Sequence, residues 1–160
     1  VIGNKAQWKN KKNKGKIIIG NNNTFNEYVN IHLPTTLKKI THIGNENYIM
    51  NSTTIDHDCY IEDNVTMSSG VILGGNVHLM KYSNLGIKTI VHQNQVIGSY
   101  TMIGMGTIIT KKKIISPGYV YYGKPAKLIR KNNFIIKKLK IDVNNLIKET
   151  QRFKKIKKEI

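Results

Sequence analysis

The sequence is poor in several residue types, and each scarcity excludes a class of protein. It contains one cysteine, Cys59, so an intramolecular disulfide framework and a multi-cysteine zinc site are both excluded. It has no uninterrupted apolar run of about 18–20 residues, the length that a membrane-spanning helix needs. Acidic residues number 9, against 26 lysines and arginines. The hydrophobic fraction of 39% still suffices for a core, which excludes a wholly disordered chain.

The net charge of +17 is concentrated at the two ends of the 160-residue chain. Residues 1–16 carry +6, residues 17–123 carry +1 and residues 124–160 carry +10. A nucleic-acid-binding domain carries its basic residues on the folded body, so this distribution makes nucleic acid an unlikely partner. We expect a nearly neutral folded body between two basic segments. The chain begins with Val1 rather than Met, so we expect a processed product or a fragment of a longer protein.

A six-residue repeat runs through the middle of the chain and predicts its fold. Every sixth residue from Ile43 to Tyr121 is apolar, fourteen in succession. Small or β-branched residues recur four positions after most of these, with Asn47, Gln95, Lys113 and Tyr119 as exceptions. Glycine often follows the apolar residue directly. A period of six fits neither an amphipathic helix nor an alternating strand. It is typical of a hexapeptide β-helix, in which the large residue points inward and Gly or Asn takes the turn dihedrals. Continued toward the N-terminus, the same six-residue frame predicts four further inward residues, Leu37, Ile31, Phe25 and Ile19.

The repeat also divides the chain into three parts. A basic N-terminal segment covers residues 1–16, the β-helix covers 17–123 with a loop insertion at 33–42, and a basic helical extension covers 124–160. Asp142 is expected to be the N-cap of a helix whose apolar residues extend to Ile160. This helix would cover the open end of the β-helix, where unpaired strand edges are otherwise exposed.

One predicted turn has the composition of a general base. His57 and Asp58 lie two and three residues after the inward Ile55, so both are expected to face outward. An aspartate beside a histidine can fix its tautomer and stabilise the imidazolium that forms when it takes a proton. The alternative is a polar turn on a solvated surface. Cys59 is expected to be core packing, His42 and His78 are expected at the surface, and no spacing of His, Asp and Glu predicts a metal site.

Residues 17–132 resemble the UDP-N-acetylglucosamine O-acyltransferases of lipid A biosynthesis, which are hexapeptide-repeat acyltransferases. The resemblance rests on Asn26–His32 with the loop after it, Ile43–Cys59, Val91-His92-Gln93 and Gly123-Lys124-Pro125-Ala126. It implies a left-handed parallel β-helix of about five to six triangular coils, 18 residues each, followed by a short α-helical extension. It also implies a homotrimer with active sites between neighbouring subunits.

The resemblance implies roles for individual residues. His57 would be the general base, Asp58 its electrostatic partner, and the backbone N–H of Gly75 an oxyanion-hole donor. Met105 would limit the length of the acyl chain. The family has a histidine where this chain has Thr54, and another where it has Asn76. Its enzymes also carry several further coils before the segment that matches this chain and a longer helical tail after it. The implied substrate-binding residues are Asn76, His92, Gln93, Asn132, Gln7 and Lys138.

The implied reaction transfers a fatty (hydroxy)acyl group to the 3-hydroxyl of UDP-N-acetylglucosamine, the first step of lipid A biosynthesis. The donor is acyl carrier protein, which holds the acyl group on phosphopantetheine; no bound cofactor or metal is expected. The location would be the cytoplasm, or a plastid in a eukaryote. The basic ends would attract the acidic carrier protein and the diphosphate of the nucleotide.

Two alternatives remain open at this point. One is an acetyl-CoA-dependent sugar O- or N-acetyltransferase on the same fold. The other is a truncated, non-catalytic β-helix with a structural or nucleic-acid-binding role.

Overall fold

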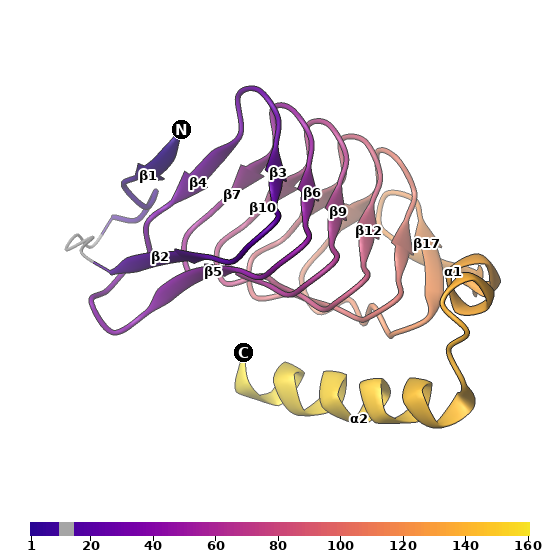
Figure 1. Ribbon diagram of the computed structural model, residues 1–160. Helices are drawn as coiled ribbons and strands as arrows, with labels where there is room; N and C mark the ends of the chain where they lie inside the picture. The colour runs from indigo at the N-terminus through magenta and orange to yellow at the C-terminus, as the bar shows by residue number, and fades with distance from the viewer. Residues whose placement is uncertain (10–14) are drawn as a thin grey trace.

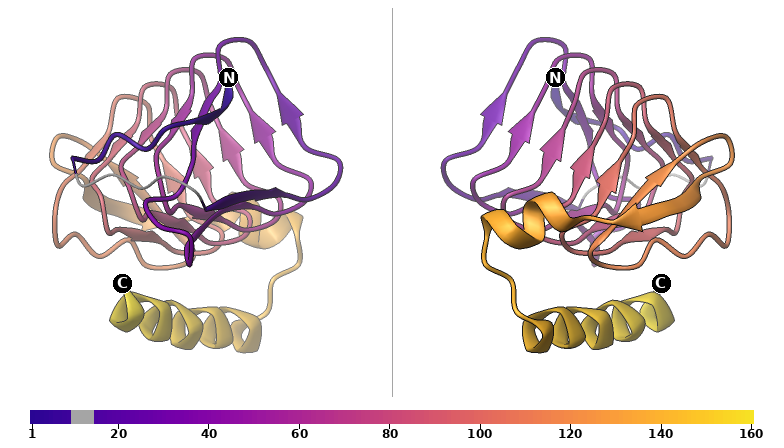
Figure 2. Two further views of the ribbon diagram at one scale, coloured as in Figure 1. Left: turned by 90° about the vertical axis from the view of Figure 1, so that its left-hand side faces the viewer. Right: turned by 90° about the vertical axis from the view of Figure 1, so that its right-hand side faces the viewer.

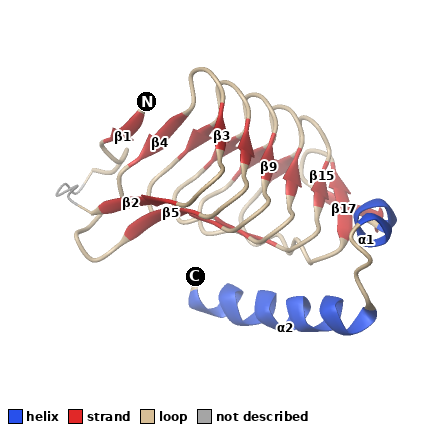
Figure 3. Cartoon of the chain, in the orientation of Figure 1, coloured by secondary structure: helices blue, strands red, loops and turns tan. Residues whose placement is uncertain are grey.

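The computed structural model describes residues 1–9 and 15–160, which form a left-handed β-helix with two helices at its C-terminal end (Figure 1). Three parallel sheets make the sides of a triangular prism, and the chain passes from one sheet to the next at each turn. Most strands are two residues long. Short turns connect them along the chain (Figure 3). The first sheet holds six strands within the described residues, so the prism has six coils.

Up to β16, each sheet takes every third strand along the chain. The first sheet contains β1 (Ile2–Asn4), β4 (Asn30–His32), β7 (Thr54–Ile55), β10 (Ile72–Leu73), β13 (Ile90–Val91) and β16 (Ile108–Ile109). The second contains β2 (Lys16–Ile19), β5 (Ile40–Ile43), β8 (Tyr60–Ile61), β11 (His78–Leu79) and β14 (Val96–Ile97). The third contains β3 (Thr24–Phe25), β6 (Tyr48–Ile49), β9 (Thr66–Met67), β12 (Asn84–Leu85), β15 (Met102–Ile103), β17 (Tyr119–Tyr122) and the antiparallel β18 (Lys127–Lys131).

The register of the sheets follows the repeat. From β7 onward, paired residues in the first sheet lie 18 apart, as Thr54, Ile72 and Ile90 do. Between the coils on either side of the loop the offset is 24, since Asn30 pairs with Thr54. The insertion therefore adds six residues to one coil without changing which residues point inward. Because β5 begins at Ile40, the loop itself covers residues 33–39 rather than the predicted 33–42.

The interior of the prism confirms the six-residue frame. All fourteen positions from Ile43 to Tyr121 are buried, with at most 4% of the side chain exposed. The small residues four positions later are buried with them, including Cys59, whose pKa burial raises to about 12. Of the earlier positions, Ile31 is buried, while Leu37 on the loop is 69% exposed. Ile19, on β2, is 37% exposed, so the frame fails both on the loop and in the first described coil.

Two different constraints act at the turns. The third residue after each inward position from Ile43 to Ile115 has a positive φ, for example Asn64 at 58° and Gly70 at 71°. Asparagine and glycine suit these positions because they reach the left-handed region at low cost. The glycines directly after the inward residue were predicted to serve the same purpose, and that is wrong. They are required by close approach: a Cβ on Gly74 would lie 2.7 Å from the backbone nitrogen of Gln93 on the next coil.

The two helices leave the end of the prism in different directions. Helix α1 (Asn133–Lys138) lies at its C-terminal end, and α2 (Val143–Glu159) returns along one side (Figures 1 and 2). The side chain of Asp142 accepts a hydrogen bond from the Asn145 N–H at 2.7 Å, which confirms the predicted N-cap. The predicted position of this helix is wrong, because α2 covers the second sheet rather than the open end. Neither described helix is long and apolar enough to cross a bilayer.

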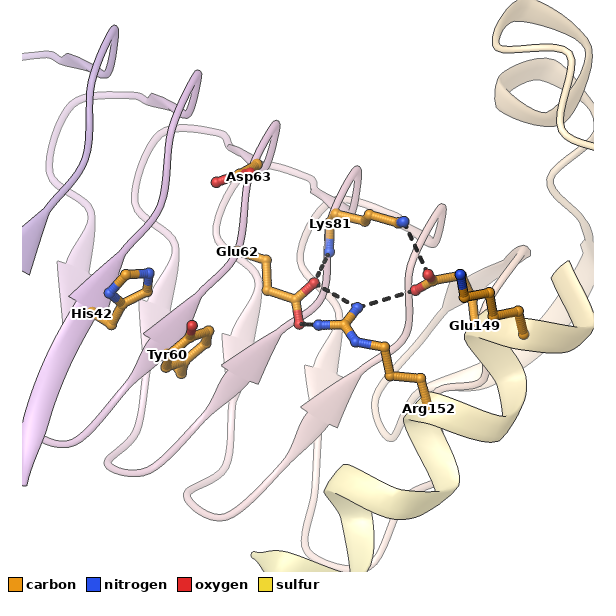
Figure 4. A pocket seen from close by; sticks show the side chains of 8 residues that line it. His42, Tyr60, Glu62, Asp63, Lys81, Glu149 and Arg152 are labelled. Atoms are coloured by element: carbon orange, nitrogen blue, oxygen red, sulfur yellow. Dashed lines mark hydrogen bonds and ion pairs between the residues drawn. The ribbon is translucent and has the colours of Figure 1, made fainter. Parts of the chain in front are cut away.

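An apolar contact and an ionic network hold α2 on the second sheet. Phe153 packs on Met80 and Val96. Beside it, Arg152 forms an ion pair with Glu62, which is 8% exposed, and another with Glu149 (Figure 4). The network borders a pocket of about 410 Å³ between helix and sheet.

The carboxylate of Glu62 is the centre of this network. It accepts hydrogen bonds from Arg152 and from the Lys81 N–H, and it lies 2.6 Å from His78 Nε2. Burial alone would raise the pKa of Glu62, but the hydrogen bonds from His78 and Arg152 outweigh burial and lower the pKa from 4.5 to about 2. His78 is therefore a structural residue of the second sheet. His42, on the same sheet, stacks on Tyr60.

Adjacent isoleucines give a direct test of the inward frame. Ile115 is 1% exposed and Ile114 is 60% exposed. Ile115→Ala is expected to lower the free energy of unfolding by about 2–5 kcal/mol, because it leaves a cavity in a closed interior. Ile114→Ala should cost about 0.5 kcal/mol or less. Urea unfolding followed by circular dichroism measures both; equal losses would contradict the frame.

Acid should weaken the attachment of α2. Because the pKa of Glu62 is lower in the folded chain than its ordinary 4.5, the ionised group stabilises the fold above about pH 4.5. That stabilisation is lost as the pH falls toward 2. Glu62→Gln should lower the free energy of unfolding at pH 7 by about 1–3 kcal/mol and flatten its decline between pH 4.5 and 2. The control is Glu27→Gln at an exposed position, and the same pH dependence in both variants would refute the role of Glu62.

Candidate functional site

The turns between the first and second sheets form an edge of the prism, called here the first edge, that collects most of the predicted site. It consists of residues 56–58, 74–76 and 92–94, which follow β7, β10 and β13. His57, Gly75 and Gln93 occupy equivalent positions on three successive coils, because the sheet pairs residues 18 apart. The register alone therefore brings together residues that are distant in the sequence.

His57 and Asp58 form a hydrogen-bonded pair at this edge. His57 Nδ1 lies 2.9 Å from Asp58 Oδ2, and the two residues are 7% and 8% exposed. Asp58 occupies the positive-φ position of its turn, with φ 61°, which turns its side chain beside the ring. Trp8 contacts the ring edge-on, with centroids 5.6 Å apart. Within the described residues no protein group bonds to His57 Nε2, so that nitrogen is available to a ligand.

Asp58 is held by the loop at 33–39. Its Oδ1 accepts from the Thr35 N–H at 2.9 Å and its Oδ2 from the Thr35 hydroxyl at 2.8 Å. Lys39 Nζ lies 3.3 Å from the same Oδ2. Burial would raise the pKa of Asp58, but the bonds from Thr35 and His57 and the charge of Lys39 outweigh it and hold the pKa below its ordinary value. Asp58 therefore stays ionised at neutral pH.

A second carboxylate lies on the other side of His57. Asp56 Oδ1 accepts from the His57 backbone N–H at 2.8 Å and lies 2.9 Å from His32 Nδ1. His32 is 5% exposed at the end of β4. His57 is thus held through its ring by Asp58 and through its backbone by Asp56.

Gly75 lies directly against the His57 ring. A Cβ at position 75 would come within 2.2 Å of His57 Cε1 and 2.5 Å of Nε2, so only glycine fits. No acceptor for the Gly75 N–H occurs within residues 1–9 and 15–160. The next residue, Asn76, donates its N–H to the His57 carbonyl at 2.8 Å, and its side chain bonds Asn94. The edge thus pairs an unoccupied imidazole nitrogen with an unoccupied backbone donor.

Three other predicted site residues, His92, Gln93 and Gln7, are exposed near this pair. His92 and Gln93 are exposed one coil further on, and His92 Nδ1 lies 3.0 Å from the Gln93 carbonyl. Gln7 is exposed and directly precedes Trp8, the residue that contacts His57.

Three predicted residues are not on the first edge. Met105 is 66% exposed at the edge between the third and first sheets. Asn132 is buried and donates its side-chain amide to the Tyr100 carbonyl at 2.9 Å, at the edge between the second and third sheets. There it lines a pocket of about 300 Å³ together with Arg130 and Phe134. Lys138, at the end of α1, lies over the Phe134 ring. One subunit does not bring these residues to His57.

Sequence reasoning missed the residues that support the pair. His32, Thr35 and Lys39 lie in a stretch on which the resemblance rests, but no role is expected for them or for Trp8. Their contacts depend on how the loop and the N-terminal segment fold onto the edge. The one available signal was the run Asp56-His57-Asp58, in which carboxylates flank the histidine on both sides. Among the described residues, no group of His, Cys, Asp and Glu could hold a metal ion.

Comparison with known proteins shows which proteins the chain is similar to, first by its repeat and then along most of its sequence. The family model described as "Bacterial transferase hexapeptide (six repeats)" matches residues 40–75, so the fold and the repeat are those of a hexapeptide-repeat transferase. An acyl-(acyl-carrier-protein)–UDP-N-acetylglucosamine O-acyltransferase of Burkholderia orbicola is 32% identical over 128 residues, 79% of this chain and 48% of the relative. The enzyme of the same name from Syntrophobacter fumaroxidans is 36% identical over 133 residues, 82% of this chain and 51% of the relative.

Solved structures agree with the sequence relatives. The Arabidopsis UDP-N-acetylglucosamine acyltransferase matches with a TM-score of 0.80 and 29% identity, over 89% of this chain and 49% of its own. The structure titled LpxA from Acinetobacter baumannii matches with a TM-score of 0.82 and 28% identity, over 95% of this chain and 59% of its own. Over most of its own length the chain is similar to UDP-N-acetylglucosamine O-acyltransferases. It spans about half the length of the curated relatives it matches.

Gly75→Ala tests the packing of the pair. The added methyl group should push the His57 ring away from Asp58 while the fold survives, at a cost of about 1–3 kcal/mol in unfolding free energy. Selective ¹⁵N labelling of histidine reports the ring in the folded variant. Gln93→Ala, at the equivalent position one coil on, should leave the His57 ring signals unchanged. An unperturbed His57 in Gly75→Ala would show that the ring does not depend on this close approach.

Proposed function

We propose that the chain carries the catalytic coils of an acyltransferase that moves a fatty hydroxyacyl group from acyl carrier protein to the 3-hydroxyl of UDP-N-acetylglucosamine, the first step of lipid A biosynthesis. The observation that carries the proposal is the first edge, where His57 Nε2 and the Gly75 N–H are both unoccupied within the described residues and lie side by side. Similarity to these enzymes supplies the substrates. A cytoplasmic or plastid location follows from the same proposal.

The geometry suits acyl transfer from a thioester. His57 Nε2 removes the proton from the 3-hydroxyl as its oxygen attacks the thioester carbonyl, and Asp58 stabilises the imidazolium. The Gly75 N–H donates to the oxyanion of the tetrahedral intermediate. Collapse of the intermediate breaks the C–S bond, and His57 returns the proton to the departing phosphopantetheine thiol. The products are the ester and the free thiol, so His57 ends in its starting state.

Substrate contacts are assigned to the residues around this pair. Asn76, His92 and Gln93 lie along the same edge and would border the sugar and the acyl chain. Asn76 stands where the family has a histidine, and it can hydrogen-bond but cannot carry a charge at pH 7. Contacts to the nucleotide sugar would come from Gln7, Asn132 and Lys138. The excess of basic residues would favour approach of an acidic carrier protein and of the nucleotide diphosphate.

A homotrimer would complete the site. Asn132 and Met105 lie on different edges from His57, so a single prism cannot present all three to one ligand. The uncovered first sheet exposes Ile72 and Ile90 in adjacent strands, at 44% and 41%. These apolar residues suit contact with a neighbouring prism. In a closed three-fold assembly, edges of neighbouring subunits meet, and Met105 would then limit the acyl chain that extends from His57.

Activity of His57 variants tests the proposal. The donors to be compared are hydroxyacyl carrier protein and acetyl-CoA, with UDP-N-acetylglucosamine as acceptor. Transfer from the carrier protein is expected to prevail, and His57→Ala should reduce it about 10²–10⁴-fold. His42→Ala, on the second sheet, is the matched control and should retain activity. Sedimentation of each sample checks that assembly is unchanged.

Two results would contradict this proposal. Faster transfer from acetyl-CoA would support a sugar acetyltransferase on the same fold. Undiminished transfer by a folded His57→Ala protein would remove the general base.

A further inference from the structure

We infer that the segment from His32 to Lys39 is a positioning clamp that fixes His57 through the two aspartates on either side of it. The inference rests on the proposed function, because a histidine needs a fixed orientation only if its nitrogen must meet a reacting proton. It assigns a role to the loop insertion that neither the repeat nor the core requires.

The loop donates hydrogen bonds to both carboxylate oxygens of Asp58. Thr35 donates from its backbone to Oδ1 and from its hydroxyl to Oδ2, at 2.9 and 2.8 Å. Lys39 adds a cation 3.3 Å from Oδ2. A carboxylate bound at two oxygens cannot rotate freely, so Oδ2 stays 2.9 Å from His57 Nδ1. Thr35 and Asp58 are both buried, which strengthens these bonds relative to bonds in water.

The other end of the segment holds Asp56. His32 Nδ1 lies 2.9 Å from Asp56 Oδ1, the same oxygen that accepts the His57 N–H. Thr41 joins the two halves of the clamp, because its hydroxyl donates to the His32 carbonyl at 2.9 Å and accepts from the Asp58 N–H at 3.2 Å. The backbone and the ring of His57 are therefore fixed from the same segment.

The loop is itself held against the first coil. A Cβ on Gly15 would lie 2.2 Å from Pro34 Cγ, 2.6 Å from the Thr36 carbonyl and 2.7 Å from the Lys39 carbonyl. The chain therefore passes Gly15 in close contact with the loop. A loop fixed in this way can position a neighbouring side chain, which a freely moving loop could not.

The charged groups that face the pair are Asp58 and Lys39 at the ring, and Asp56 with His32 at the backbone. Lys39 and the two donors of Thr35 hold the Asp58 carboxylate in place. Removing the Thr35 hydroxyl or the Lys39 cation should therefore loosen Asp58 and release the ring.

The decisive experiment compares three variants of one loop. Thr35→Val removes the hydroxyl and keeps the shape, Thr35→Ser keeps the hydroxyl, and Thr36→Val is an exposed neighbour in the same loop. Histidine ¹⁵N spectra should show the Nδ1-protonated tautomer of His57 in the wild type, in Thr35→Ser and in Thr36→Val. Thr35→Val should show a mixture of tautomers, with kcat reduced about 10-fold and KM unchanged.

The His57 tautomer tests the clamp, and acyl transfer by the wild type tests the proposed function, so the two can fail separately. A wild-type His57 tautomer in folded Thr35→Val would overturn the clamp. A changed tautomer in a protein whose wild type transfers no acyl group would support the clamp and defeat the proposed function.

If Thr35→Val does not fold, Lys39→Met and its exposed neighbour Lys38→Met replace it. The clamp predicts a mixture of His57 tautomers in Lys39→Met alone, and the same single tautomer in both lysine variants would overturn it.

Discussion

The structure depends on the stacking of one coil on the next at a fixed offset. Backbone hydrogen bonds run from each coil to its neighbour, such as Thr54 N–H to the Val71 carbonyl and Ile72 N–H to the Thr89 carbonyl, both at 2.9 Å. A coil of 18 residues closes only if each side has the same length, so every hexad must turn at the same place. The inward apolar residue, the buried small residue and the positive-φ residue all follow from that one requirement.

The candidate site is built on the same regular turns as the rest of the prism. Asp58 occupies the positive-φ position of its turn, which in several other coils is asparagine or glycine. An aspartate tolerates this conformation, and its carboxylate is then directed to the adjacent histidine. Gly75 occupies the position equivalent to His57 on the next coil, and its missing side chain leaves room for the ring. Regular stacking therefore builds a row of chemical groups along an edge without any special backbone.

The loop at 33–39 and helix α2, which lie outside the repeat, supply contacts that the coils cannot make. The loop at 33–39 supplies hydrogen-bond donors that a six-residue turn is too short to bring to Asp58. Helix α2 covers the second sheet through Phe153 and the ionic network of Glu62, so the first sheet is left uncovered beside the candidate site. Which face is free for a neighbouring subunit is therefore decided by where the helix lies.

Local sequence determined the repeat, the interior from Ile43 to Tyr121, the N-cap at Asp142 and the outward turn of His57, because each depends on residues within a few positions of one another. The tertiary structure alone decided the rest. Thr35 meets Asp58 across 23 residues and Arg152 meets Glu62 across 90, and no periodic pattern encodes such contacts. The same holds for the path of α2 and for the separation of Asn132 and Met105 from His57. Those features depend on how whole coils, loop and helix pack, which is set by the sum of many distant interactions.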